Sequence, residues 1–207
     1  MLTDWPKYAV LASGTGSIFQ AICDADQRGE IPGELSLFIT DQPDCYALER
    51  AKQAGVETRV FKRQKYRDKF EMEEDILAIL RAFQVQYIVM AGYMRILSPH
   101  FISHYKDRII NTHPSLLPAF KGLDAVKQAY DYGVKVTGCT VHLVTEKMDD
   151  GPVLMQTAVQ VEKEDTVASL TEKIKSEEKK QIITAIKALL SGRIDIIDNH
   201  RWVMLDG

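Results

Sequence analysis

An amide, an imidazole and a hydroxyl fall within five residues in segment 111–115. The segment follows the apolar pair Ile109 and Ile110, which is typical of the end of a buried strand. Pro114 disfavours helical backbone at the preceding residue, so we predict that His113 is extended and pinned. Asn111 and His113 are two residues apart, and on an extended chain their side chains point the same way. Their N–H groups could donate to one oxygen, as in the oxyanion sites of acyl transfer.

A site of this kind needs a carboxylate that orients the imidazole and favours its charged form. Asp149 and Asp150 are the candidates, because they lie in the loop before Gly151 and Pro152. The alternative is that His113 is a core histidine satisfied by the fold and Asp149 an ordinary turn residue. Ser115 lacks the surroundings of a nucleophile elbow, so we interpret its hydroxyl as a turn or capping group.

A glycine turn near the N-terminus is a second candidate site, made of Gly14, Thr15, Gly16 and Ser17. It lies between a predicted strand at 8–12 and a predicted helix from Ile18. Glycines allow close backbone approach, and a helix N-terminus offers free N–H groups, so the turn suits a phosphate. It is not a Walker A loop, and Phe19 stands where a dinucleotide fingerprint needs its third small residue. The alternative is a tight turn without a ligand.

The predicted elements alternate over the first half of the chain. Strands are expected at 35–40, 58–61 and 85–90 and from 108, with helices between them, one capped by Asp44 and another at 68–83. Such alternation predicts a parallel, doubly wound sheet.

The second half follows a different pattern. Strands at 136–144 and 153–161, joined by a Gly-Pro loop, predict antiparallel pairing. His142 alternates within the first of them, so we interpret it as structural. A long helix is expected from about 166 to 190, with Asp165 as a candidate first residue, and a small edge strand at 202–204. The chain is therefore predicted to be one α/β domain, Rossmann-like and mostly parallel, extended by antiparallel strands and a long C-terminal helix.

Composition narrows the function classes. The 207 residues include 26 Lys and Arg against 29 Asp and Glu, a net charge of −3, which gives no general attraction to nucleic acid or membrane. Three separated cysteines without a CxxC motif favour a reducing cytoplasm and no zinc site. No apolar run is long enough to span a bilayer, and the N-terminus lacks a signal-peptide pattern. We expect a cytoplasmic protein without a metal.

Read together, these segments resemble the folate-dependent formyltransferases. The strongest match is segment 111–118, Asn-Thr-His-Pro-Ser-Leu-Leu-Pro, combined with the aspartate loop at 148–152. Segments 12–17, 40–44, 91–99 and 135–142 extend the similarity over nearly the whole chain. Segment 92–97 and the chain length favour the branch that formylates glycinamide ribonucleotide in purine synthesis.

The resemblance implies a role for each candidate residue. Asn111, His113 and Asp149 would be the catalytic trio. Arg95, Ile96 and Leu97 would hold the pterin-type head of 10-formyltetrahydrofolate, and the loop 144–149, including Val144, Thr145 and Asp149, would close over it. The ribonucleotide phosphate would lie at Gly14, Thr15, Gly16 and Ser17 with Lys69 as a cation, and Glu178 would contact the ribose or glycine end. Residues 1–105 would be the phosphate-binding half and residues 106–207 the folate-binding and catalytic half.

Three positions depart from the family pattern, and all lie on the amine-substrate side. Thr15 and Ile18 replace two asparagines of the phosphate turn, and Lys179 replaces a histidine on the long helix. Two alternatives follow: formylation of another small amine such as an amino-sugar nucleotide, or a non-catalytic phosphate or nucleotide binder. The expected partners are small molecules, without nucleic acid, membrane or metal, and the expected state is a monomer or homodimer.

Overall fold

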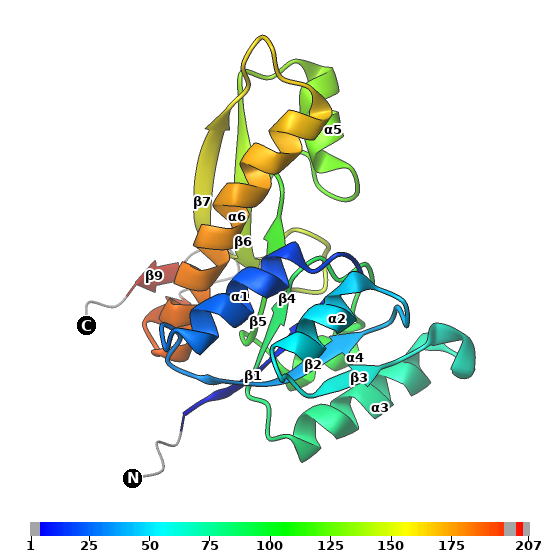
Figure 1. The fold of residues 1–207 in the computed structure, drawn as a ribbon. Coiled ribbons are helices and arrows are strands. Elements are labelled where there is room, and N and C mark those ends of the chain that lie inside the picture. The colour runs from blue at the N-terminus through cyan, green and yellow to red at the C-terminus, as the bar shows by residue number, and fades with distance from the viewer. Residues whose placement is uncertain (1–4, 197–201, 205–207) are drawn as a thin grey trace.

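One seven-stranded sheet organises residues 5–196 and 202–204, the part of the chain that this computed structural model describes. The strand order is β3-β2-β1-β4-β5-β6-β7. The first five strands are parallel, and β6 and β7 add antiparallel pairs at one edge, which confirms the predicted sheet (Figure 1). The strands are β1 Lys7–Leu11, β2 Glu34–Thr40, β3 Thr58–Val60, β4 Tyr87–Met90, β5 Ile109–His113, β6 Val136–Leu143 and β7 Val153–Gln160.

Helices cover both faces of this sheet. On one face lie α1 (Ser17–Gln27), α2 (Tyr46–Gln53) and α6 (Val167–Leu190). On the other lie α3 (Lys69–Ala82) and α4 (Pro99–His104). The helix α5 (Ala125–Tyr132) lies beside the N-terminal part of α6, and Arg63–Lys65 form a short 3-10 helix (Figure 1). No helix in this part of the chain is long and apolar enough to cross a membrane.

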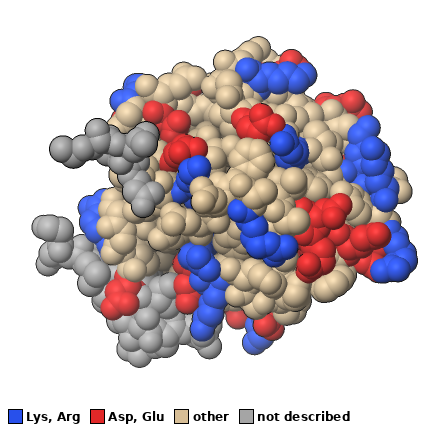
Figure 2. Space-filling view, turned by 90° about the horizontal axis from the view of Figure 1, so that it is seen from below, with Lys and Arg blue, Asp and Glu red and all other residues tan. Residues whose placement is uncertain are grey.

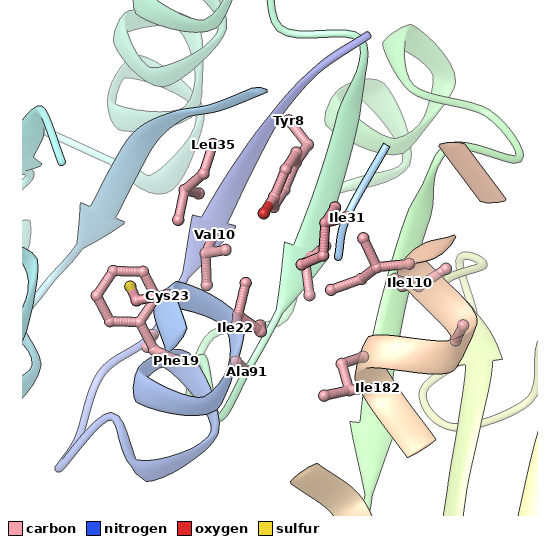
Figure 3. Close-up of a cluster of buried hydrophobic side chains, with 14 of the residues drawn as sticks. Tyr8, Val10, Phe19, Ile22, Cys23, Ile31, Leu35, Ala91, Ile110 and Ile182 are labelled. Carbon is pink, nitrogen blue, oxygen red and sulfur yellow. The ribbon is translucent and has the colours of Figure 1, made fainter. Parts of the chain in front are cut away.

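The core is divided by the alternation of side chains along each strand. Val10 of β1 and Ile110 of β5 join Phe19 and Ile22 of α1 and Ile182 of α6 (Figure 3). The side chains of Ala9, Leu11 and Ile109 point to the other face of the same strands and pack against α3 and α4. Because both faces are covered, the central strands are almost continuously apolar. Two neighbouring residues of β5 therefore face two different layers of the molecule.

Helix starts differ partly from the sequence prediction. The cap assigned to Asp44 is wrong, because Cys45 is the N-cap of α2 and has no side-chain capping bond. The prediction for α3 is confirmed, with Asp68 as N-cap accepting the Glu71 N–H. At α6 the N-cap is Thr166, which forms a capping box with Ser169, and the neighbouring Asp165 is not the first residue.

Two strands differ from the sequence prediction in pairing or in length. The strand predicted at 202–204 is confirmed as β9 (Trp202–Met204), but it pairs with β8 (Ile194–Ile196) as a separate ribbon and not with an edge of the main sheet. The strand expected from 108 is confirmed as β5, which continues beyond the apolar pair through the extended His113 by pairing with β6. This pairing places Asn111 directly opposite His142. The Leu117–Pro118 bond that follows is cis.

Charges are distributed without a dominant sign on the face that Figure 2 shows. Acidic and basic side chains alternate there with uncharged surface. Many of the ion pairs join exposed neighbours, such as Lys52 with Glu49 and Lys175 with Glu172. Pairs of this kind contribute little to stability.

The close approach of β6 and β7 gives a stability prediction. A Cβ added at Gly138 would lie 2.0 Å from the Thr157 carbonyl oxygen of β7 and 2.9 Å from a Leu116 methyl. Gly138→Ala should therefore lower the free energy of unfolding by about 1–3 kcal/mol or more, measured by urea denaturation. Gly14→Ala is the matched control, because nothing lies within 4 Å of its added Cβ. Equal stability of the two variants would contradict the close strand packing.

Candidate active site

The predicted catalytic residues line one cavity of about 610 Å³, here called the main cavity. It opens where β4 and β5 end, on the face that carries α3 and α4. A volume of this size suits a cofactor-sized organic ligand. Asn111, His113 and Asp149 all contribute to its wall, together with His142.

Asp149 is a buried carboxylate between two imidazoles. Its Oδ2 lies 3.5 Å from His113 Nδ1, and its Oδ1 lies 3.7 Å from His142 Nε2. The Gly122 N–H donates to Oδ2 at 2.8 Å. The neighbouring Asp150 pairs with Lys121 instead. The structure therefore brings Asp149 to His113, and Asp150 faces a different partner.

His113 is 5% exposed and has an acceptor at each ring nitrogen. Nδ1 faces Asp149, and Nε2 lies 2.9 Å from the Phe120 carbonyl oxygen. The doubly protonated ring could donate to both groups, and the neutral ring to only one of them. The sequence predicted that His113 and Asn111 donate to one oxygen. In this structure His113 Nε2 instead lies within hydrogen-bond distance of the Phe120 carbonyl.

The loop that supplies these backbone contacts has unusual backbone angles. Phe120 has a φ of 51° and Asp124 a φ of 56°, both in the left-handed region that disfavours residues with a Cβ. Each such residue costs on the order of 1 kcal/mol or more and persists only where the surroundings impose it. Here the strained loop presents the Phe120 carbonyl to His113 and the Gly122 N–H to Asp149.

His142 belongs to this site, although the sequence indicated a structural role. Its Nδ1 lies 2.9 Å from the Leu143 carbonyl, to which it can only donate, so Nε2 is left as an acceptor. Asn111 Nδ2 lies 3.3 Å from that Nε2. Burial lowers the pKa of His142, which favours this neutral form. The bond fixes the Asn111 amide, whose NH₂ group keeps a second hydrogen for a ligand.

The residues expected on the folate side lie around the same cavity as the trio. They come from the segment after β4 and from the loop after β6: Arg95, Ile96, Leu97, Val144 and Thr145. Leu97 is buried, whereas the Ile96 side chain is 61% exposed at the rim. The geometry thus places one apolar cavity beside the carboxylate–imidazole group.

The glycine turn lies outside both cavities described in this structure. Gly16 is the N-cap of α1 with a φ of 69°, and an added Cβ would lie 2.7 Å from Ala47 Cβ, so glycine is required there. Thr15 is exposed, and its carbonyl accepts from Arg50 Nε at 2.9 Å. Ile18 is half-buried and packs against the core. The turn offers backbone N–H groups at the start of α1.

Lys69 and Glu178 lie apart from the main cavity. Lys69 lines a smaller cavity of about 350 Å³ with Arg63 and segment 93–97, and its Nζ is 3.6 Å from a Glu73 oxygen. The structure therefore does not bring Lys69 and the glycine turn into one cavity. Glu178 of α6 is buried and accepts from Thr112 Oγ1 at 2.7 Å. Burial raises the pKa of Glu178, and the Thr112 bond opposes that rise.

Thr112 lies between the two catalytic candidates of β5 and faces the opposite layer. Ile110, with the same orientation, packs among α1 and α6, so Glu178 lies on the α1 and α6 side of the strand. Within the described residues, no group of three or more His, Cys, Asp or Glu side chains is placed to hold a metal ion.

Comparisons with known proteins indicate the family of the chain. A family model described as formyl transferase matches residues 6–186. The Bacillus subtilis protein named phosphoribosylglycinamide formyltransferase is 40% identical over 184 residues, which are 89% of this chain and 94% of that protein. The human trifunctional purine biosynthetic protein adenosine-3 is 39% identical over 95% of this chain, but the chain spans only 20% of that protein's length.

A solved structure gives the same picture. Glycinamide ribonucleotide transformylase 1 from Symbiobacterium toebii superposes with a TM-score of 0.94 at 40% identity, covering 98% of this chain and 95% of that one. The two chains are therefore similar in sequence as well as in fold over nearly their whole lengths.

The lowered pKa of His142 gives a pH prediction. The unfolded chain binds a proton at this position below about pH 6.5, whereas the folded protein resists it. The stabilising contribution is therefore complete above that pH and is lost as the pH falls. Between about pH 7.5 and pH 5.5, the wild type should lose more unfolding free energy than His142→Gln, measured by urea titration. Identical losses would contradict a neutral buried His142.

Proposed function

The chain belongs to the formyl transferase family, and from this premise we propose that it transfers the formyl group of 10-formyltetrahydrofolate to the primary amine of glycinamide ribonucleotide in purine biosynthesis. Relatives matched over nearly their full length carry the name of this reaction. The observation that carries the proposal is the buried Asp149 beside His113, next to Asn111, in a cavity that a folate head group would fit.

The trio acts on the charge that develops during attack. When the amine adds to the formyl carbon, the carbonyl electrons move to oxygen and form a tetrahedral oxyanion. The second N–H of the Asn111 amide donates to this oxygen, and the His113 imidazolium adds positive charge. In this scheme His113 Nε2–H exchanges the Phe120 carbonyl for the oxyanion. Asp149 keeps the imidazolium charged and oriented throughout.

Collapse of the intermediate completes the transfer. The bond between the formyl carbon and folate N10 breaks, and its electron pair goes to N10. The proton lost by the attacking amine moves to N10, with Asp149 assisting through a water molecule. Atoms and charge balance without an acyl-enzyme, because the new carbon–nitrogen bond forms before the old one breaks.

The two faces of β5 suggest how the substrates are arranged. The folate lies in the main cavity against Arg95, Ile96 and Leu97, under the loop that contains Val144, Thr145 and Asp149. The ribonucleotide lies on the α1 and α6 side, with its phosphate at Gly14, Thr15, Gly16 and Ser17 and its ribose or glycine end at Glu178. Lys69 lines the smaller cavity, so its assignment to the phosphate requires the ribonucleotide to reach that cavity.

The alternative acceptor, an amino-sugar nucleotide, is supported by Ile18 and Lys179. Ile18 packs on the core and has no side-chain donor for a phosphate, and Lys179 adds a cation next to Glu178. Both differences change the amine side only. We place the reaction in the cytoplasm, since Cys23, Cys45 and Cys139 are free thiols, as expected in a reducing compartment.

The acceptor is tested by a direct assay. Purified protein is incubated with 10-formyltetrahydrofolate and either glycinamide ribonucleotide or an amino-sugar nucleotide, and the release of tetrahydrofolate is followed by absorbance. We expect a higher kcat/KM with glycinamide ribonucleotide. A higher value with the amino-sugar nucleotide would replace the acceptor. Ligand-induced thermal stabilisation without turnover would instead favour a non-catalytic binder.

The trio is tested in the same assay by single substitutions. Asn111→Ala should lower kcat by about 10²- to 10³-fold, because one oxyanion donor is lost. Asp149→Asn should also lower kcat, since it removes the charge that holds His113. Asp150→Asn is the matched control, because Asp150 pairs with Lys121, and it should keep turnover within a few-fold. If Asn111→Ala kept near-normal turnover, the oxyanion assignment would be wrong.

A further inference from the structure

The two segments proposed to hold the two substrates touch each other where β1 and β4 end. The Ser13 N–H donates to the Gly92 carbonyl at 3.0 Å, and the Met94 N–H donates to Ser13 Oγ at 3.0 Å. Ser13 directly precedes the glycine turn, and Met94 directly precedes segment 95–97. These hydrogen bonds couple the position of the glycine turn to that of segment 95–97.

A single buried carboxylate connects these segments. Asp41, which directly follows β2, is 3% exposed. Its Oδ1 accepts from Ser13 Oγ at 2.6 Å, and its Oδ2 accepts from Arg95 Nε at 2.7 Å. Gln42 Nε2 also donates to Oδ2, at 3.0 Å. Side chains that follow three different parallel strands thus meet on one group.

Burying a carboxylate is costly unless it is paired and hydrogen-bonded. Here the cost is offset by a guanidinium and two neutral donors, and charge-assisted bonds are stronger than neutral ones. A hydrophobic residue would fill this position without such a cost. The charged group instead defines the relative positions of Ser13 and Arg95, at the carboxyl edge of the sheet where open α/β folds bind ligands.

Arg95 is held by this contact and not left as a free surface charge. Its side chain is 32% exposed, and the Nε bond to Asp41 restrains the backbone from which segment 95–97 continues. The far end of the same segment has its own anchor, because the Ser98 N–H and hydroxyl both donate to the buried Glu73. The Asp41 contact is the one that reaches across to the glycine turn.

We propose that Asp41 is a positioning residue that locks the glycine turn and segment 95–97 into one rigid unit, so that the amine substrate and the formyl donor are held at a fixed separation. This inference rests on the proposed function, because that function assigns the two substrates to these two segments. Asp41 itself touches neither substrate in this account. It acts through Ser13 on one side and through Arg95 on the other.

The test compares both KM values with kcat. Asp41→Ala should lower kcat by up to about 100-fold, because misplacement of the reacting groups by about 1 Å has effects of this size. Both KM values should also rise, because the two segments that bind the substrates are no longer held in place. Asp44→Ala is the matched control in the same loop, because Asp44 is exposed, and it should keep both KM values.

Two milder variants keep the test decisive if Asp41→Ala folds poorly. Asp41→Asn keeps an oxygen for Ser13 but turns an NH₂ group toward Arg95, so KM for the formyl donor should rise more than KM for the amine. Ser13→Ala keeps the Asp41–Arg95 pair but removes the hydroxyl that contacts both Asp41 and the Met94 N–H. KM for the amine should then rise more than KM for the formyl donor, because Arg95 stays held by Asp41. The proposal would be overturned if, in Asp41→Asn and in Ser13→Ala alike, the KM values for the amine and for the formyl donor changed equally or did not change.

A last measurement separates this proposal from the proposed function. If the wild type does not formylate glycinamide ribonucleotide, the acceptor assignment fails, and calorimetric binding of tetrahydrofolate then tests the role of Asp41 alone. Asp41→Asn should still weaken that binding relative to Asp44→Ala. If the wild type turns over normally and Asp41→Asn matches it in both KM values, the proposed function stands and the positioning role of Asp41 is wrong.

Discussion

The buried charge of Asp149 is the constraint on which the site depends. A carboxylate that is nearly removed from water needs partners, and the fold supplies them from separate elements. His113 comes from the end of β5 and the Gly122 N–H from a strained loop, while His142 of β6 fixes the Asn111 amide opposite it. The register of β5 and β6 is therefore a chemical requirement as well as a packing one. A slip of one residue would turn Asn111 and His113 away from the main cavity.

Alternation along β5 also separates the two halves of the proposed reaction. Asn111 and His113 face the main cavity, while Thr112 between them reaches Glu178 on the opposite layer. In the proposed arrangement, Asn111 and His113 face the formyl donor, and Glu178, bonded to Thr112, faces the ribose or glycine end of the amine substrate. Asp41 connects the glycine turn, through Ser13, with segment 95–97, through Arg95. In this proposal, these contacts together hold the two substrates at a fixed distance from each other.

Much of this was predictable from local pattern. Alternating strands and helices were identified from sequence, and the helix predicted at 68–83 is α3, whose Ile76, Leu77 and Leu80 are buried in the core. The extended conformation of His113 followed from Pro114, and the family resemblance indicated Asp149. Contacts that depend on register or on the main chain were not predictable. The role of His142 requires its pairing opposite Asn111, the Phe120 contact uses a backbone carbonyl, and the Asp41 contact joins distant segments.

The central claim is direct transfer of the formyl group through an oxyanion held at Asn111 and His113. It is tested most directly with 10-formyltetrahydrofolate that carries heavy isotopes at the formyl carbon and oxygen, followed by mass spectrometry of the products. Direct transfer predicts that both labels appear together in formylated glycinamide ribonucleotide, in equal amount to the tetrahydrofolate released. Labelled formate without a formylated ribonucleotide, or loss of the oxygen label during transfer, would contradict the account.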